Sequence, residues 1–147
     1  MSNPTIQRMQ ARVGQEITES PSPLSKWLRG TLLKAEPGEL TLQFTVREEM
    51  TNPMGIIHGG MVAAIIDDVI GMTVFSLHHE FFYTSVNLNI DFLASAKLGT
   101  TITAHSGIVR QGRNIIHAEC CVLDTEGKLL AKGSSNLLVT QIRKPGA

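Results

Sequence analysis

Residues 55–71 have the sequence GIIHGGMVAAIIDDVIG, an apolar run with the residue types of a buried helix. Two adjacent carboxylates, Asp67 and Asp68, lie near its middle. An ionised aspartate taken out of water costs several kcal/mol unless hydrogen bonds, a charge or a shifted pKa compensates it. We therefore expect either that both side chains reach water or that one of them has a function.

The pattern around this run predicts one long helix enclosed by antiparallel strands. Apolar residues at spacings of three and four predict a further helix over 4–18, which PSP at 21–23 ends. A single helix cannot cover its own apolar surface, whereas a curved antiparallel sheet of five or six strands can bury it. We expect an α+β fold with a short N-terminal helix, in a single domain over residues 1–147. Alternation predicts the strands within 28–36, 40–46, 83–93, 100–110, 114–124 and 129–140, with the turn PGE at 37–39 between the first two.

Charge and composition give no sign of a nucleic acid or membrane partner. Thirteen Lys and Arg balance thirteen Asp and Glu, so an anionic ligand must be met by local basic residues. Residues 59–77 approach transmembrane length, but the two aspartates and the flanking histidines argue against a membrane span. The first twenty residues lack the apolar stretch of a secretory signal, and Cys120 and Cys121 suit the core of a protein in a reducing compartment. We expect a cytoplasmic protein.

The entrance of the apolar helix is a candidate site for an oxyanion. The first turn of a helix has N–H groups without internal partners, and Gly59 and Gly60 let a ligand carbonyl approach them. An equally good interpretation is that the glycines only permit a tight turn beside a structural His58. Because a helix rises about 1.5 Å per residue, Gly59 lies roughly 12 Å from Asp67 along the axis. The two cannot act on one carbonyl within a chain, but a two-fold dimer with antiparallel helices can bring Gly59 of one chain to Asp67 of the other.

The other candidates are less distinctive. Side chains of adjacent helical residues point about 100° apart, and this geometry does not choose between Asp67 and Asp68. In RQGRN at 110–114, two arginines flank a glycine at a strand turn, where they either hold a phosphate or face solvent. We expect no metal site, because no His, Cys and carboxylate residues have the spacing of a ligand set. The sequence also lacks the GxSxG motif of serine hydrolases and a dinucleotide fingerprint.

Taken together, these residues resemble the hotdog-fold acyl-CoA thioesterases, in particular the branch of the phenylacetate-degradation thioesterase PaaI. The resemblance rests on Asn52, then His58 with Gly59 and Gly60, then Asp67, and on TSVNLNIDFLASAKLG at 84–99. The stretches IVRQGRN at 108–114 and EGKLLAKGSS at 126–135 also match. It covers roughly residues 30–140 and leaves the helical extension of residues 1–27 outside.

The resemblance implies the hotdog fold, an active site at a dimer interface and a role for Asp67 rather than Asp68. The Gly59 N–H would polarise the thioester carbonyl, while Asp67 of the opposite chain would attack it or activate a water. Asn52 and His58 would position the reacting groups, and Ser85 would assist beside Asp67. The residues that would bind coenzyme A are Gly60, Arg110, Gln111, Gly112, Arg113 and Asn114.

These residues predict an acyl-CoA thioesterase that hydrolyses an acyl- or aryl-acyl-CoA to the free acid and coenzyme A. No cofactor is expected, because coenzyme A enters as part of the substrate. The minimum active unit is expected to be a homodimer, and relatives suggest a homotetramer. Two alternatives use the same fold: a non-catalytic acyl-CoA-binding protein, against which the acid at Asp67 argues, and a hydratase or dehydratase. The sequence does not identify the acyl group.

Overall fold

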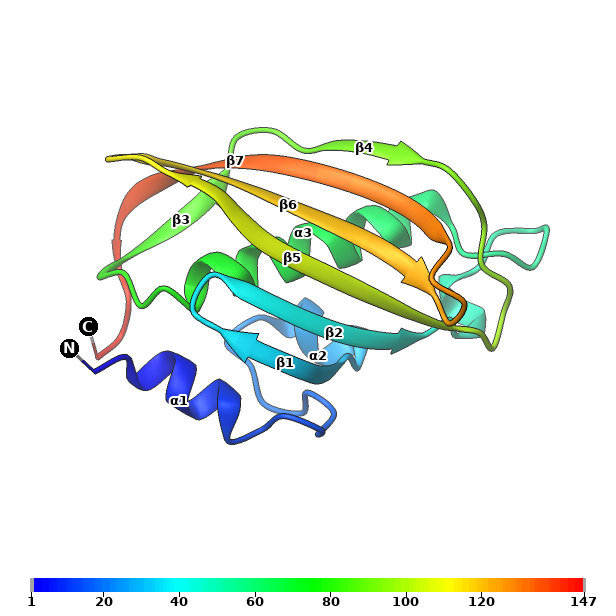
Figure 1. Cartoon of the computed structure of the whole chain (residues 1–147), viewed down its shortest axis with the longest axis horizontal. Helices are drawn as coiled ribbons and strands as arrows, with labels where there is room; N and C mark the ends of the chain where they lie inside the picture. The colour runs from blue at the N-terminus through cyan, green and yellow to red at the C-terminus, as the bar shows by residue number, and fades with distance from the viewer. Residues whose placement is uncertain (1, 147) are drawn as a thin grey trace.

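Seven antiparallel strands curve around one long helix in the computed structural model, which describes residues 2–146 (Figure 1). The helices are α1 (Pro4–Gln10), α2 (Pro23–Leu28) and α3 (Gly59–Phe75), with a 3-10 turn at Glu48–Met50. The strands are β1 (Thr31–Glu36), β2 (Glu39–Thr45), β3 (Phe81–Ser85), β4 (Asn89–Phe92), β5 (Thr101–Gln111), β6 (Ile115–Asp124) and β7 (Leu129–Arg143). The sheet order is β1-β2-β5-β6-β7-β3, and β4 also pairs with β7. The predicted architecture is confirmed, with seven strands where five or six were predicted.

The long helix α3 is the centre of the hydrophobic core. Its buried residues are Val62, Ile65, Ile66, Val69, Ile70, Thr73 and Val74. They are covered by the concave face of the sheet, which contributes buried residues of β5 and β6 such as Ala104 and Ala118. A Cβ atom at Gly133 of β7 would lie 2.9 Å from the Ile66 Cγ2 atom, so glycine permits the closest approach of sheet and helix. No helix within residues 2–146 is long and apolar enough to cross a membrane.

The predicted hairpin between β1 and β2 is confirmed and is tied to the end of α3. Gly38 occupies the turn with φ +79°, a conformation that favours glycine. Its N–H donates to the Ser76 hydroxyl (2.9 Å), which in turn donates to the Thr73 carbonyl (2.6 Å). The hairpin therefore fixes the position of the last turn of α3.

The strand predicted over 83–93 is divided in the structure. β3 ends at Ser85 and β4 begins at Asn89, although both pair with β7. Between them the Asn87 side-chain oxygen accepts the Asn136 N–H (2.8 Å), and the Asn87 carbonyl accepts the Ser135 hydroxyl (2.8 Å). Side-chain hydrogen bonds of this kind compete with regular backbone pairing between strands. The alternation of polar and apolar residues continues across the break and therefore did not predict it.

The helix predicted over 4–18 is shorter than expected. α1 ends at Gln10, and the chain then turns at Gly14 to lie beside β1, with the Gly14 N–H donating to the Leu32 carbonyl (2.7 Å). A second helix, α2, follows where only a helix stop was predicted. Ser22 accepts the Ser25 N–H as its N-cap and Pro23 occupies the first helical position, so Ser-Pro starts a helix here rather than ending one.

Candidate active site

The loop before α3 presents one free backbone donor. His58 is the N-cap of the helix, and its Nδ1 atom accepts the Gly60 N–H (2.8 Å). The His58 carbonyl accepts the N–H groups of Met61 (2.9 Å) and Val62 (3.2 Å). Within residues 2–146 the Gly59 N–H has no such acceptor, and it lies at the positive end of a 17-residue helix. Of the first-turn donors, Gly59 is therefore the one left for a ligand oxygen.

His58 and Asn52 organise this loop. Because the His58 Nδ1 atom accepts a hydrogen bond, any proton on the neutral ring lies on Nε2. The Asn52 side-chain oxygen accepts the Met54 N–H (3.0 Å), and the Asn52 N–H donates to the Ile56 carbonyl (2.9 Å). These bonds give both residues a role in shaping the loop, and they leave the role of Asn52 toward a substrate as a prediction.

Asp67 and Ser85 meet on the exposed side of α3. The Ser85 hydroxyl donates to Asp67 Oδ1 at 3.1 Å, a contact between the middle of the helix and the end of β3. Ser85 lies on the same face of β3 as Tyr83, which packs against the core, and the break after Ser85 separates this face from the alternation that follows in β4. Both residues are exposed in the single chain. The pair leaves Asp67 Oδ2 without a partner within residues 2–146, and this oxygen is available to a water or a carbonyl carbon.

Asp68 has different surroundings. The Ser25 hydroxyl lies 2.8 Å from both carboxylate oxygens, and the Ser22 hydroxyl lies 3.4 Å from Oδ1. Burial raises the pKa of Asp68, although the hydrogen bonds from the two serines oppose that shift and the nearby Asp67 adds to it. Asp67 therefore reaches water, whereas Asp68 is partly buried and its carboxylate is compensated by hydrogen bonds.

The structure does not bring all the predicted site residues together within one chain. The loop before α3 lies at one end of the molecule, and the β5–β6 turn that carries residues 110–114 lies at the other (Figure 1). That turn is near the C-terminal end of α3, since Gln111 Nε2 lies 3.0 Å from His79 Nε2. The Gly112 N–H donates to the Ile115 carbonyl (2.8 Å), as in an ordinary hairpin turn, while Arg110 and Arg113 are exposed. Gly59 and residues 110–114 of one chain thus lie at opposite ends of the molecule and are too far apart to contact the same small ligand.

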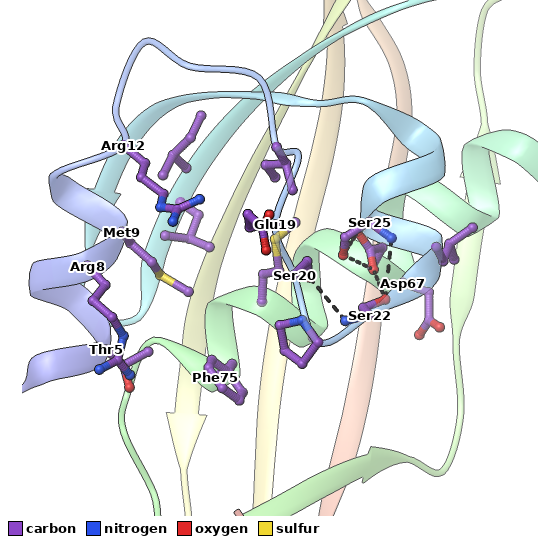
Figure 2. A pocket seen from close by; sticks show the side chains of 18 of the residues that line it. Thr5, Arg8, Met9, Arg12, Glu19, Ser20, Ser22, Ser25, Asp67 and Phe75 are labelled. Atoms are coloured by element: carbon purple, nitrogen blue, oxygen red, sulfur yellow. Dashed lines mark hydrogen bonds between the residues drawn. The ribbon is translucent and has the colours of Figure 1, made fainter. Parts of the chain in front are cut away.

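A cavity of about 800 Å³ opens beside Asp67. One side is formed by α3 and β3, from Asp67 and Ser85 to Phe75 and Phe82. The rest of the lining comes mainly from the N-terminal extension, and Figure 2 shows Arg8 and Met9 of α1 across the cavity from Ser22 and Ser25, which lie beside Asp67. Sequence analysis did not predict this second side, because residues 1–27 fall outside the resemblance. The Ser-Pro pair at 22–23 was the local signal for its structure.

Comparisons with known proteins identify the family of this chain. The family model of the thioesterase superfamily matches residues 54–131, from the loop before α3 into β7. Acyl-coenzyme A thioesterase 13 of Homo sapiens is 32% identical over 104 residues, which make up 70% of this chain and 74% of that protein.

Two solved structures support the fold. The E. coli PaaI protein from the phenylacetic acid degradation operon superposes with a TM-score of 0.82 at 17% identity, covering 96% of this chain and 97% of that one. The Streptococcus mutans UA159 protein smu.793, solved bound to acetyl CoA, superposes with a TM-score of 0.73 at 25% identity, covering 78% of this chain and 91% of that one. The chain belongs to the thioesterase superfamily and has the hotdog fold.

Proposed function

We propose that this protein hydrolyses acyl-CoA thioesters at a site formed by two chains. The observation that carries the proposal is the hydrogen bond from Ser85 to Asp67 in the lining of a cavity, with the free Gly59 N–H on the same helix. The relationship to an acyl-CoA thioesterase and the likeness to a protein solved with acetyl CoA support the substrate class.

The carboxylate of Asp67 is suited to start the reaction. Ser85 holds Oδ1 and thereby fixes the direction of Oδ2. Oδ2 either attacks the thioester carbonyl carbon, giving a mixed anhydride that water then hydrolyses, or takes a proton from a water that attacks it. On both routes the carbon–sulfur bond breaks, the thiolate of coenzyme A leaves and takes up a proton, and the acid is released. The Gly59 N–H stabilises the negative charge that develops on the carbonyl oxygen.

Two chains are needed because of the length of the helix. Eight residues separate Gly59 from Asp67, which is roughly 12 Å along the axis, whereas attacking group and oxyanion donor must each lie about 3 Å from atoms of one carbonyl group. Antiparallel α3 helices related by a two-fold axis place Gly59 of the partner subunit opposite Asp67. Two equivalent sites result, and we propose a homodimer as the minimum active unit, with pairing of dimers into a tetramer expected from relatives.

The same arrangement gives the β5–β6 turn a role in binding coenzyme A. A two-fold axis across α3 brings the partner's helix entrance beside Asp67, which is closer than the chain's own helix entrance to the end of the molecule that carries residues 110–114 (Figure 1). The exposed Arg110 and Arg113 are then available to the phosphates of a CoA molecule whose thioester lies at Gly59 of the partner subunit.

The test is hydrolysis of acetyl-, octanoyl- and phenylacetyl-CoA, measured as release of free thiol, by wild type and two matched variants. Asp67→Asn keeps the size of the side chain and removes its charge, so we expect turnover to fall by roughly 10²–10⁴-fold. Asp68→Asn makes the same change at the neighbouring position and is expected to have a much smaller effect. Circular dichroism and thermal unfolding would establish that both variants fold. Undiminished turnover by folded Asp67→Asn would refute the proposal.

A further inference from the structure

The side of the cavity made by the N-terminal extension depends on few attachments. The first attachment is at residues 14–17, which lie beside β1. The Ile17 N–H donates to the Gly30 carbonyl (2.8 Å), and Glu16 forms an isolated β-bridge with Thr31. Residues 18–21 belong to no helix or strand. The position of this stretch is therefore set by the contacts at its two ends.

At the second end, Asp68 holds the start of α2, while Arg47 holds the end of that helix by donating to the carbonyls of Trp27 (2.6 Å) and Leu28 (3.1 Å). Ser25 is 1% exposed, and its hydroxyl lies 2.8 Å from both Asp68 oxygens, so its single proton can serve either one. Ser22 adds a longer contact to Oδ1 and also caps α2, which ties the start of that helix to α3. Removing the Ser25 hydroxyl would leave a partly buried carboxylate with only the longer contact, and partners of a buried charge are costly to lose.

The cavity that this segment closes is suited to an apolar group. It runs along α3 from Asp67 to Phe75, roughly 12 Å by the rise of the helix. Its apolar lining includes Met9, Ile17 and Leu32, as well as Met72, Phe75 and Phe82. Charged residues of the N-terminal segment also line it, but in balanced number: Arg8, Arg12, Glu16 and Glu19. The chemistry that matches is an acyl group longer than acetyl, with its thioester at Asp67.

We propose that Ser25 and Asp68 are positioning residues that hold residues 15–25 against the cavity and thereby select the acyl group. The proposal rests on the proposed function only for the identity of the ligand. It gives Asp68 a role that the catalytic mechanism does not, since this carboxylate contacts the N-terminal segment and Asp67 contacts Ser85. Loss of the attachment should weaken binding of a long acyl chain more than that of an acetyl group, because a long chain extends farther along the cavity that the segment lines.

The test compares Ser25→Ala and Asp68→Ala with Asp68→Asn, which keeps one acceptor oxygen for Ser25. Ser135→Ala is the matched control, because Ser135 is also buried and hydrogen-bonded but lies on β7 and does not line the cavity. For each full-length protein, kcat and KM are measured with octanoyl-CoA and acetyl-CoA. Amide hydrogen exchange of residues 15–25 is measured in the absence of substrate.

We expect Ser25→Ala and Asp68→Ala to speed exchange in residues 15–25 and to lower the octanoyl-to-acetyl ratio of kcat/KM. The ratio should fall roughly tenfold, the discrimination that about one methylene group gives in an apolar pocket, mainly through KM for octanoyl-CoA. Asp68→Asn should restore part of both effects, and Ser135→Ala should show neither. Unchanged exchange would overturn the attachment, and faster exchange with an unchanged ratio would overturn its role in selection. If wild type hydrolyses none of acetyl-, octanoyl- and phenylacetyl-CoA, the proposed function fails, while the exchange measurement still decides whether Asp68 holds the segment.

Discussion

Replacement of Gly59 by proline should remove the oxyanion donor and leave the fold intact. Gly59 is the first residue of α3, where the N–H makes no bond within the helix and proline is well tolerated. The preceding His58 has φ −68° and ψ 137°, the extended conformation that a residue before proline requires. A Cβ atom at position 59 would lie 3.5 Å from the Phe92 ring, which is ordinary contact. We therefore expect the free energy of unfolding to change by less than about 1 kcal/mol.

The loss of activity should be much larger. Removing one oxyanion-hole donor costs roughly 10²–10³-fold in kcat, about 2.7–4 kcal/mol of transition-state stabilisation. Gly59→Ala provides the control, because it adds a Cβ atom at the same place and keeps the N–H. Thiol release with the best acyl-CoA of the panel gives kcat for both variants, and urea unfolding establishes that both fold. A folded Gly59→Pro protein with kcat within about threefold of Gly59→Ala would refute the assignment of this donor.

Three other predictions concern buried polar groups. The Ser106 hydroxyl is buried with no hydrogen-bond partner within residues 2–146, so Ser106→Ala should keep or raise the free energy of unfolding measured in urea, and a loss of more than about 1 kcal/mol would contradict this. Burial raises the pKa of Asp68 above its ordinary 3.8, so its contribution to stability is greatest at low pH and is lost as pH rises through the raised pKa. Asn cannot lose a proton, and the stability of Asp68→Asn relative to wild type should therefore increase between about pH 4 and pH 7, whereas an unchanged difference would argue against a buried charge. Burial raises the pKa of Cys120 to about 12, so iodoacetamide at neutral pH should leave this thiol unmodified in the folded protein, as mass spectrometry would show.

The parts of the fold that sequence analysis predicted correctly are those with a strong local pattern. The apolar run that begins at Gly59 and the alternating strands from Thr101 onward each specify one structure by periodicity, and their ends carry turn residues. The break after Ser85 was missed because it depends on hydrogen bonds from Asn87 to residues of β7, nearly fifty positions away. Periodicity carries no information about such distant partners.

The candidate site also has features that local sequence predicted and features that it did not. Helix geometry alone predicted that Gly59 and Asp67 lie too far apart to share a carbonyl, because rise per residue is a property of any α-helix. The different surroundings of Asp67 and Asp68 were not predictable from periodicity, since they arise from contacts with Ser85 and Ser25, which lie in other elements. The cavity wall made by the N-terminal segment was missed for the same reason.

The two-chain site is tested most directly by mixing two inactive chains. Asp67→Asn and Gly59→Pro, each with a different affinity tag, are made separately and together, and the protein carrying both tags is purified. In a mixed dimer, one site has both defects and the other has neither. Random pairing should therefore restore about a quarter of wild-type activity to the unfractionated mixture, about half to a doubly tagged dimer, and somewhat more than a quarter to a doubly tagged tetramer. If each chain contained a complete site, every site would carry one defect. The doubly tagged protein would then be as inactive as its parents, and this result would contradict the shared site.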